Sequence, residues 1–85
     1  MTKDELMDVL EIAQKYQRMA AGIVGMNVNM FVYDGEDYLV PMILDVDIND
    51  GEEWHCWTFS SVTTTEMYRE KVNAIVDMLA KLEVL

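Results

Sequence analysis

The hydrophobic pattern changes its period twice along these 85 residues, and this change constrains the fold more than any other feature. Near both ends of the chain, apolar residues recur at three- and four-residue spacing, which is the period of an amphipathic helix. Between about residues 26 and 60 they alternate with other residues, as in a strand with two different faces. The pattern predicts an α+β fold with the order α-β-β-β-α.

Each predicted helix begins with a capping box, in which a threonine and a glutamate three residues later satisfy free backbone N–H groups. The two boxes are Thr2 with Glu5 and Thr63 with Glu66. Gly22 or Gly25 is expected to end the first helix, because glycine readily adopts the left-handed conformation of a C-cap. The predicted apolar faces of the two helices are Leu6, Val9, Leu10, Ala13, Tyr16 and Ala20, and Tyr68, Val72, Ile75, Val76, Leu79 and Leu82.

Three antiparallel strands are predicted between the helices, with hairpin turns at Asp34-Gly35 and Asn49-Asp50-Gly51. The first strand has Met26, Val28, Met30 and Val32 on one side, and the second, about 38–46, has Tyr38, Val40, Met42, Leu44 and Val46 inward. In the third, about 53–60, alternation separates Trp54, Cys56 and Thr58 from His55, Trp57 and Phe59. It leaves open which set faces the helices.

Pro41 conflicts with the simplest strand order. The second strand of a plain meander is central, and proline cannot donate a hydrogen bond to the ladder. The sequence therefore predicts either a bulge at Pro41 or a strand order other than 1-2-3.

Length and composition indicate one small domain covering residues 1–85. A hydrophobic content of 52% excludes an intrinsically disordered acidic tail. A chain of this size buries only about two-thirds of its unfolded surface, so a partner or a second copy would help its stability. Cys56 is the only cysteine, which excludes an internal disulfide and fits a reducing compartment. With neither a signal peptide nor about 20 consecutive apolar residues, the chain is expected to be cytoplasmic.

Charge is distributed unevenly along the chain. Residues 22–62 contain eight acidic residues and no basic residue, whereas each flank contains four acids and three bases. A field of one sign favours cationic partners and repels nucleic acid and anionic membranes, so we expect a basic protein partner and no direct nucleic-acid or membrane binding. A solubilising surface that discourages strand pairing at edges is the plainer alternative. The eight candidate contact residues are Asp34, Glu36, Asp37, Asp45, Asp47, Asp50, Glu52 and Glu53.

No cofactor, metal site or catalysis is predicted. The segment from Asp45 begins like a calcium loop, but Gly51 falls at the seventh position and Cys56 at the twelfth, so an acidic hairpin turn is favoured. His55 and Cys56 are neighbours on a strand and should point to opposite faces, which argues against a cysteine–histidine nucleophile.

Two helices on one face of the sheet would leave the other face open. By alternation this face includes Phe31, Tyr33, Leu39 and Ile43, and contiguous exposed apolar area often marks an interface. Trp54 and Trp57 are further interface candidates because aromatic residues often anchor protein contacts. A dimer or a docked partner is therefore expected.

A short acidic α-β-β-β-α chain with carboxylates at Asp34-Gly35-Glu36-Asp37 and from Asp45 to Glu53 resembles the small phage-encoded anti-CRISPR and anti-restriction inhibitors. Several of those proteins are DNA mimics. The resemblance covers architecture and charge, without a shared motif. It implies a non-enzymatic inhibitor whose carboxylates occupy a basic nucleic-acid-binding site of a host protein or nuclease. The alternative function is a homodimeric acidic adaptor, similar to secretion chaperones, that binds through the apolar sheet face.

Overall fold

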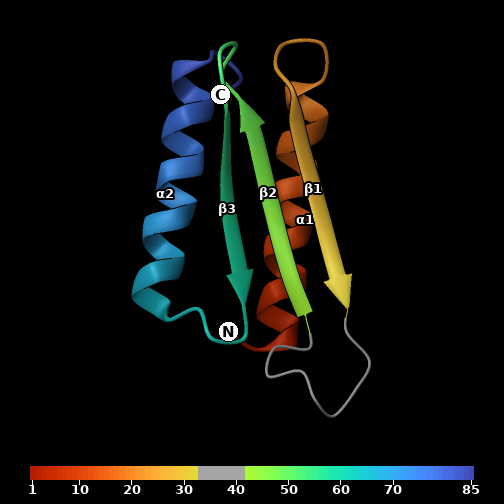
Figure 1. The fold of residues 1–85 in the computed structure, drawn as a ribbon, viewed down its shortest axis with the longest axis vertical. Coiled ribbons are helices and arrows are strands. Elements are labelled where there is room, and N and C mark those ends of the chain that lie inside the picture. The colour runs from red at the N-terminus through yellow and green to blue at the C-terminus, as the bar shows by residue number, and fades with distance from the viewer. Residues whose placement is uncertain (33–41) are drawn as a thin grey trace.

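The computed structural model describes residues 1–32 and 42–85. The elements, in chain order, are α1 (Lys3–Ala20), β1 (Met26–Val32), β2 (Met42–Asn49), β3 (Trp54–Ser60) and α2 (Thr65–Lys81) (Figure 1). The predicted α+β fold and element order are thus confirmed. The predictions for Tyr33, Asp34, Gly35, Glu36, Asp37, Tyr38, Leu39, Val40 and Pro41 lie outside the described residues.

The predicted capping box starts α1. The Thr2 hydroxyl oxygen accepts a hydrogen bond from the Glu5 N–H at 3.2 Å, and the Glu5 carboxylate accepts one from the Thr2 N–H at 3.1 Å. Of the two candidate C-cap glycines, Gly22 follows the helix end with a φ of +82°, so the left-handed residue is Gly22. The predicted apolar face is buried or half-buried along its whole length.

The prediction for the start of α2 was wrong by one residue. Thr64, not Thr63, is the N-cap, and its hydroxyl oxygen accepts from the Met67 N–H at 3.2 Å. Thr63 is buried and accepts a hydrogen bond from the Ser60 N–H at 2.9 Å, closing the turn that follows β3. The two adjacent threonines thus have different roles, because the N–H groups of Ser60 and Met67 each need an acceptor. Neither helix has an apolar stretch long enough to cross a membrane in the described part of the chain.

The sheet is an antiparallel meander with the strand order β1-β2-β3 (Figure 1). Val28 lies opposite Val46, which lies opposite Trp57, and this register fixes the faces of all three strands. The alternative of a different strand order is therefore wrong. The described central strand begins at Met42, the residue after Pro41.

Both helices pack on one face of the sheet. Four helix-facing side chains of β2 and β3, Leu44, Val46, Ile48 and Phe59, have exposed fractions of 0%. Side chains of α1 (Val9, Ile12, Ala13 and Tyr16) and α2 (Val72 and Ile75) line one apolar pocket together with Val46 and Phe59. The register also answers the question that alternation left open, because His55, Trp57 and Phe59 share a face with Ile48, Val46 and Leu44.

Candidate functional site

The opposite face of the sheet is not covered by either helix, and we call it the open face. Its residues come from all three strands and lie in transverse rows set by the register. They are Asn27, Asn29 and Phe31 of β1, Ile43, Asp45, Asp47 and Asn49 of β2, and Trp54, Cys56, Thr58 and Ser60 of β3. The centre of this face is polar and contains two carboxylates.

Asp45 and Asp47 lie two residues apart on the central strand, so their side chains project from the same face at a spacing of roughly 7 Å. The Thr58 hydroxyl donates to the Asp45 carboxylate at 2.8 Å. Across the sheet, Asn29 lies beside Asp45 and Asn27 beside Asp47. The residues that the register places beside the two carboxylates are polar, and none of them carries a positive charge.

Cys56 lies beside Asp47 on the open face and is exposed. The hydrogen bond from its thiol to the Asp47 carboxylate raises the pKa of Cys56, and burial and the negative charge of Asp47 act in the same direction. The thiolate is the reactive form, so Cys56 is a poor nucleophile at neutral pH. His55 points to the helix-facing side, as the alternation predicts for neighbours on a strand.

All six basic residues of the chain lie in the two helices. Lys3, Lys15 and Arg18 belong to α1, and Arg69, Lys71 and Lys81 belong to α2. Within residues 1–32 and 42–85, no lysine or arginine forms an ion pair with a carboxylate, and the two ion pairs present both involve His55. No carboxylate of the sheet is therefore directly paired with a lysine or arginine of the helices in the described part of the chain.

Lys71 comes nearest to the sheet. Its Nζ donates to the Thr58 backbone carbonyl and stands 5.7 Å from the centroid of the Phe59 ring. Phe59 lies on the helix-facing side, so this cation occupies the β3 edge and the helical layer. It does not lie over Asp45 or Asp47.

The β2–β3 turn is held by its own side chains. The Asp50 carboxylate accepts hydrogen bonds from the backbone N–H groups of Glu52 and Glu53 at 2.8 and 2.9 Å. Gly51 has a φ of +101°, which side chains rarely tolerate. The hydrogen bond from the Glu53 N–H, with those from His55 and the Glu52 N–H, lowers the pKa of Asp50 from its ordinary value of 3.8 to about 2.

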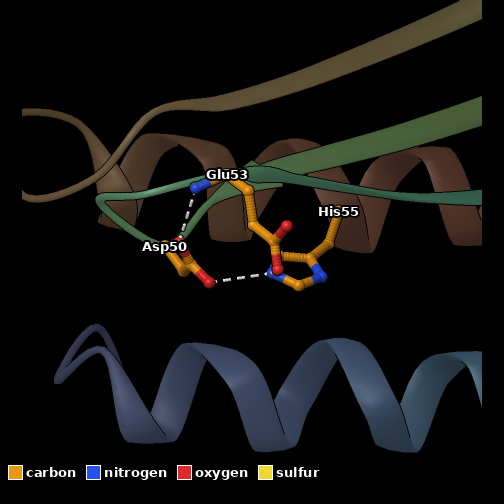
Figure 2. Close-up of side chains that lie close together, drawn as sticks. All are labelled: Asp50, Glu53 and His55. Carbon is orange, nitrogen blue, oxygen red and sulfur yellow. Dashed lines mark hydrogen bonds and ion pairs between the residues drawn. The ribbon is translucent and has the colours of Figure 1, made fainter.

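Asp50, Glu53 and His55 form a cluster beside this turn (Figure 2). The His55 Nε2 lies 2.9 Å from the Asp50 Oδ2 and 3.7 Å from the Glu53 Oε1, and three potential ligand atoms lie within 4.8 Å of one another. One imidazole and two carboxylates can bind a divalent transition metal. The hydrogen bond between His55 and Asp50 already accounts for this arrangement.

The cluster shows that the acidic residues do not all share one surface. His55 lies on the helix-facing side, and the Asp50 carboxylate that contacts it points the same way. Asp45 and Asp47 project from the open face instead, so the calcium-like spacing does not gather the three aspartates around one ion. Glu52 and Glu53 are exposed at the end of the sheet. Asp34, Glu36 and Asp37 lie outside the described residues.

The two predicted tryptophans lie on different faces. Trp54 lies on the open face with an exposed fraction of 53%, and its ring covers Gly25, where an added Cβ would be 3.1 Å from the ring. Trp57 is half-buried on the helix-facing side and stacks on His55, with ring centroids 6.3 Å apart and planes inclined by 24°. Trp54 is therefore the tryptophan that the open face presents.

Phe31 and Ile43 lie opposite each other at one end of the open face. The exposed fraction of Phe31 is 45%, and Ile43 is half-buried. Tyr33 and Leu39, predicted to extend this apolar area, lie outside the described residues. In the described part, the area formed by Phe31 and Ile43 is confined to one row, and Trp54 lies at the other end of the open face.

Sequence reasoning overlooked the polar neighbours of the two carboxylates, Asn27, Asn29, Cys56 and Thr58. Alternation contained this information, because each of these residues has the parity that places it beside Asp45 or Asp47 once the register is known. No protein family, curated protein or solved structure matches this chain. The function must be inferred from the geometry itself.

Proposed function

We propose that this protein is a non-enzymatic, cytoplasmic binding protein that docks the acidic open face on a basic surface of another protein. One observation carries the proposal. All six basic residues belong to the helices behind the sheet, while Asp45 and Asp47 project from the open face without a cationic neighbour among the described residues. An acidic surface that served only solubility would gain nothing from this separation.

The energetics favour a partner with several cations. Two unit charges about 7 Å apart interact by only about 0.6 kcal/mol in water, so a single carboxylate contributes little. Interaction energies add over several pairs and increase as docking excludes water. The exposed Trp54 ring offers a further contact for a guanidinium group, which favours arginine over lysine at that position.

A nucleic-acid-binding site is the most suitable partner surface, since such sites gather arginine and lysine to bind phosphates. Carboxylates that occupy this site would exclude the nucleic acid without any chemical step. The protein would then act as an inhibitor of a nuclease or another DNA-binding protein, which is the function implied by the resemblance to anti-CRISPR and anti-restriction inhibitors.

The proposal can be tested with two double variants of equal net charge. Asp45→Asn with Asp47→Asn removes two charges from the open face, and Glu66→Gln with Glu70→Gln removes two from exposed positions of α2. Each immobilised protein is used to capture proteins from a host lysate, followed by elution with salt or with double-stranded DNA. We expect a basic protein to be captured by the wild type and the α2 variant, to be released by both eluents, and to be missing with the open-face variant.

Two results would contradict the proposal. Equal capture by the two double variants would show that net charge, not the open face, determines binding. Binding that persists at about 1 M salt, where the Debye length is about 3 Å, would show that charge is not the main contribution.

A second candidate function is the homodimeric adaptor that binds through the apolar part of the open face. The adjacent Phe31 and Ile43 side chains support it. Its partner binding would be insensitive to salt and lost in Ile43→Lys, whereas Asp45→Asn with Asp47→Asn would leave it intact.

A further inference from the structure

Among the described residues, the edge of β1 that faces away from β2 has backbone groups without a hydrogen-bond partner. In an antiparallel ladder, alternate residues direct their N–H and C=O groups towards the same neighbour. Gly25 accepts from the Asn49 N–H at 2.9 Å, so Asn27, Asn29 and Phe31 bond to β2. Met26, Val28, Met30 and Val32 therefore direct their groups to the free edge. Gln17 of α1 confirms this direction, because its Nε2 donates to the Met26 carbonyl at 3.1 Å.

Of these edge residues, only Met26 has a hydrogen-bond partner for an outward backbone group in the described part of the chain. Apart from the Gln17 bond, no hydrogen bond to residues 1–32 or 42–85 reaches the outward backbone groups of Val28, Met30 or Val32. A row of such donors and acceptors is complementary to another strand. The chemistry of this edge thus selects an extended backbone as its partner.

The other edge of the sheet is protected at its Thr58–Ser60 end. Lys71 of α2 donates to the outward carbonyl of Thr58, and the outward N–H of Ser60 donates to the Thr63 hydroxyl oxygen at 2.9 Å. Helix α2 runs alongside β3, whereas no labelled element lies beyond β1 (Figure 1). Strand addition is therefore favoured at one edge only.

The β1 edge is also free of charge. Natural edge strands usually carry a lysine, a proline or an inward charge that prevents pairing, yet Met26–Val32 contains none of these, although 26% of the chain is charged. The flank of α1 on this side, marked by Gln17, carries no carboxylate, and Lys3 is its one charged residue. At helical spacing it includes Met7, Leu10 and Gln14, and Met7 is exposed.

We propose that a second copy of this chain pairs with the β1 edge. A two-fold axis perpendicular to the sheet would bring the two β1 strands together antiparallel and form one continuous six-stranded sheet. A second copy fits this edge because Met26–Val32 has no charged side chain, so the two β1 strands of chains with a net charge of −10 can pair without opposing carboxylates between them. The protected β3 edges prevent further addition, so the assembly closes as a dimer.

The dimer has a consequence for the open face. The two-fold axis places both helical layers on one side of the sheet and both open faces on the other. Asp45 and Asp47 of both copies then belong to one surface, and the asparagines of the two β1 strands lie between the two pairs of carboxylates. The dimer does not depend on the proposed function, but it would double the acidic area available to a basic partner.

Hydrogen exchange of the wild-type protein tests the pairing directly. The amides of Asn27, Asn29 and Phe31 should be protected at all protein concentrations because they bond to β2. The amides of Val28, Met30 and Val32 should exchange rapidly in dilute protein and slow on the order of tenfold or more as the concentration rises. The mass from light scattering should rise in parallel towards twice 9.8 kDa.

Two variants separate this edge from the open face. Met30→Pro removes one outward N–H and leaves the β1–β2 ladder intact, because proline is tolerated where the N–H faces away from the sheet. We expect Met30→Pro to be monomeric and Ile43→Lys to remain dimeric. A wild-type monomer at high concentration, a dimer that survives Met30→Pro and dissociates in Ile43→Lys, or equal exchange of all six β1 amides would overturn the proposal. If Met30→Pro does not fold, the wild-type exchange pattern decides.

Discussion

The helical layer and the sheet solve the problem of solubility in different ways. Helix α1 contains four acids and three bases, and α2 contains three of each, so the exposed helix surfaces are nearly neutral. Residues 42–60 contain five acids and no base. The helices show that mixed charges suffice for a solvated surface in this protein. The one-sided sheet therefore calls for another explanation, and binding of a cationic surface supplies one.

The two regions also differ in how their polar groups serve the fold. Threonines cap both helices, and Lys71 and Thr63 satisfy backbone groups of β3. On the open face, Asp45 and Asp47 accept hydrogen bonds from side chains only, and no backbone group depends on them among the described contacts. We infer that the helical layer maintains the fold, whereas the open face can change with little effect on stability.

The largest expected difference separates the two faces of β2. Leu44 is fully buried under the helices, and Leu44→Ala should lower the free energy of unfolding by about 2–5 kcal/mol through lost burial and the cavity that remains. Ile43→Ala on the open face should cost less than about half of that. Urea denaturation followed by circular dichroism measures both values. Similar losses would mean that the open face is covered in the native protein.

A smaller difference is expected between polar groups of the two regions. Thr64→Ala removes the N-cap of α2 and should lower the free energy of unfolding by about 1 kcal/mol. The double variant Asp45→Asn with Asp47→Asn should stay within about 0.5 kcal/mol of the wild type, as is usual for surface substitutions. Thermal unfolding of the three proteins tests this contrast, and a severe loss in the double variant would assign the carboxylates a structural role.

The β2–β3 turn should contribute a pH dependence of its own. Because the pKa of Asp50 is lowered from 3.8 to about 2, its carboxylate stabilises the folded state fully above about pH 4. This contribution is lost as the pH falls from about 4 towards 2. Asp50→Asn should therefore show a shallower fall of the melting temperature over this interval than Asp77→Asn, which removes the same charge from α2. Parallel curves would contradict the hydrogen bonding of the turn.

The smallest effect concerns the Cys56 thiol. Its raised pKa predicts slow alkylation by iodoacetamide at neutral pH, since only the thiolate reacts. In Asp47→Asn the negative charge is removed, so the pKa should fall and the pH profile of the reaction should shift to lower pH. Asp77→Asn serves as the control of equal charge. An unchanged profile in Asp47→Asn would show that the two side chains do not interact.

The sequence predicts the elements well because helix faces and strand alternation are local patterns. The apolar stripe from Leu6 to Ala20 can be read from spacing, and so can the placement of Asp45 and Asp47 on the same face of a strand. The orientation of β3 depends on the register with β2, and spacing alone does not fix it. The cap of α2 was misplaced because Thr63 and Thr64 are chemically equivalent, and only the position of the Ser60 N–H distinguishes them.

The candidate site was predictable to a similar extent. Its two central carboxylates follow from alternation, whereas the exposed position of Trp54 on the open face depends on the register of β3 with β2. The turn of Asp50 towards His55 was not predictable, because it depends on the backbone conformation at Gly51 and on the face that His55 occupies. The acidic residues consequently divide between two sides of the sheet, which a count of charges cannot reveal.

A nuclear magnetic resonance titration with a short arginine-rich peptide tests the central claim most directly, because it identifies the face that meets a cationic ligand. We predict that the largest amide shifts fall on Asn27, Asn29, Asp45, Asp47, Cys56 and Thr58, together with the Trp54 indole N–H, and that added salt reverses them. Shifts concentrated on the acids of α1 and α2, with the open face unchanged, would contradict the account.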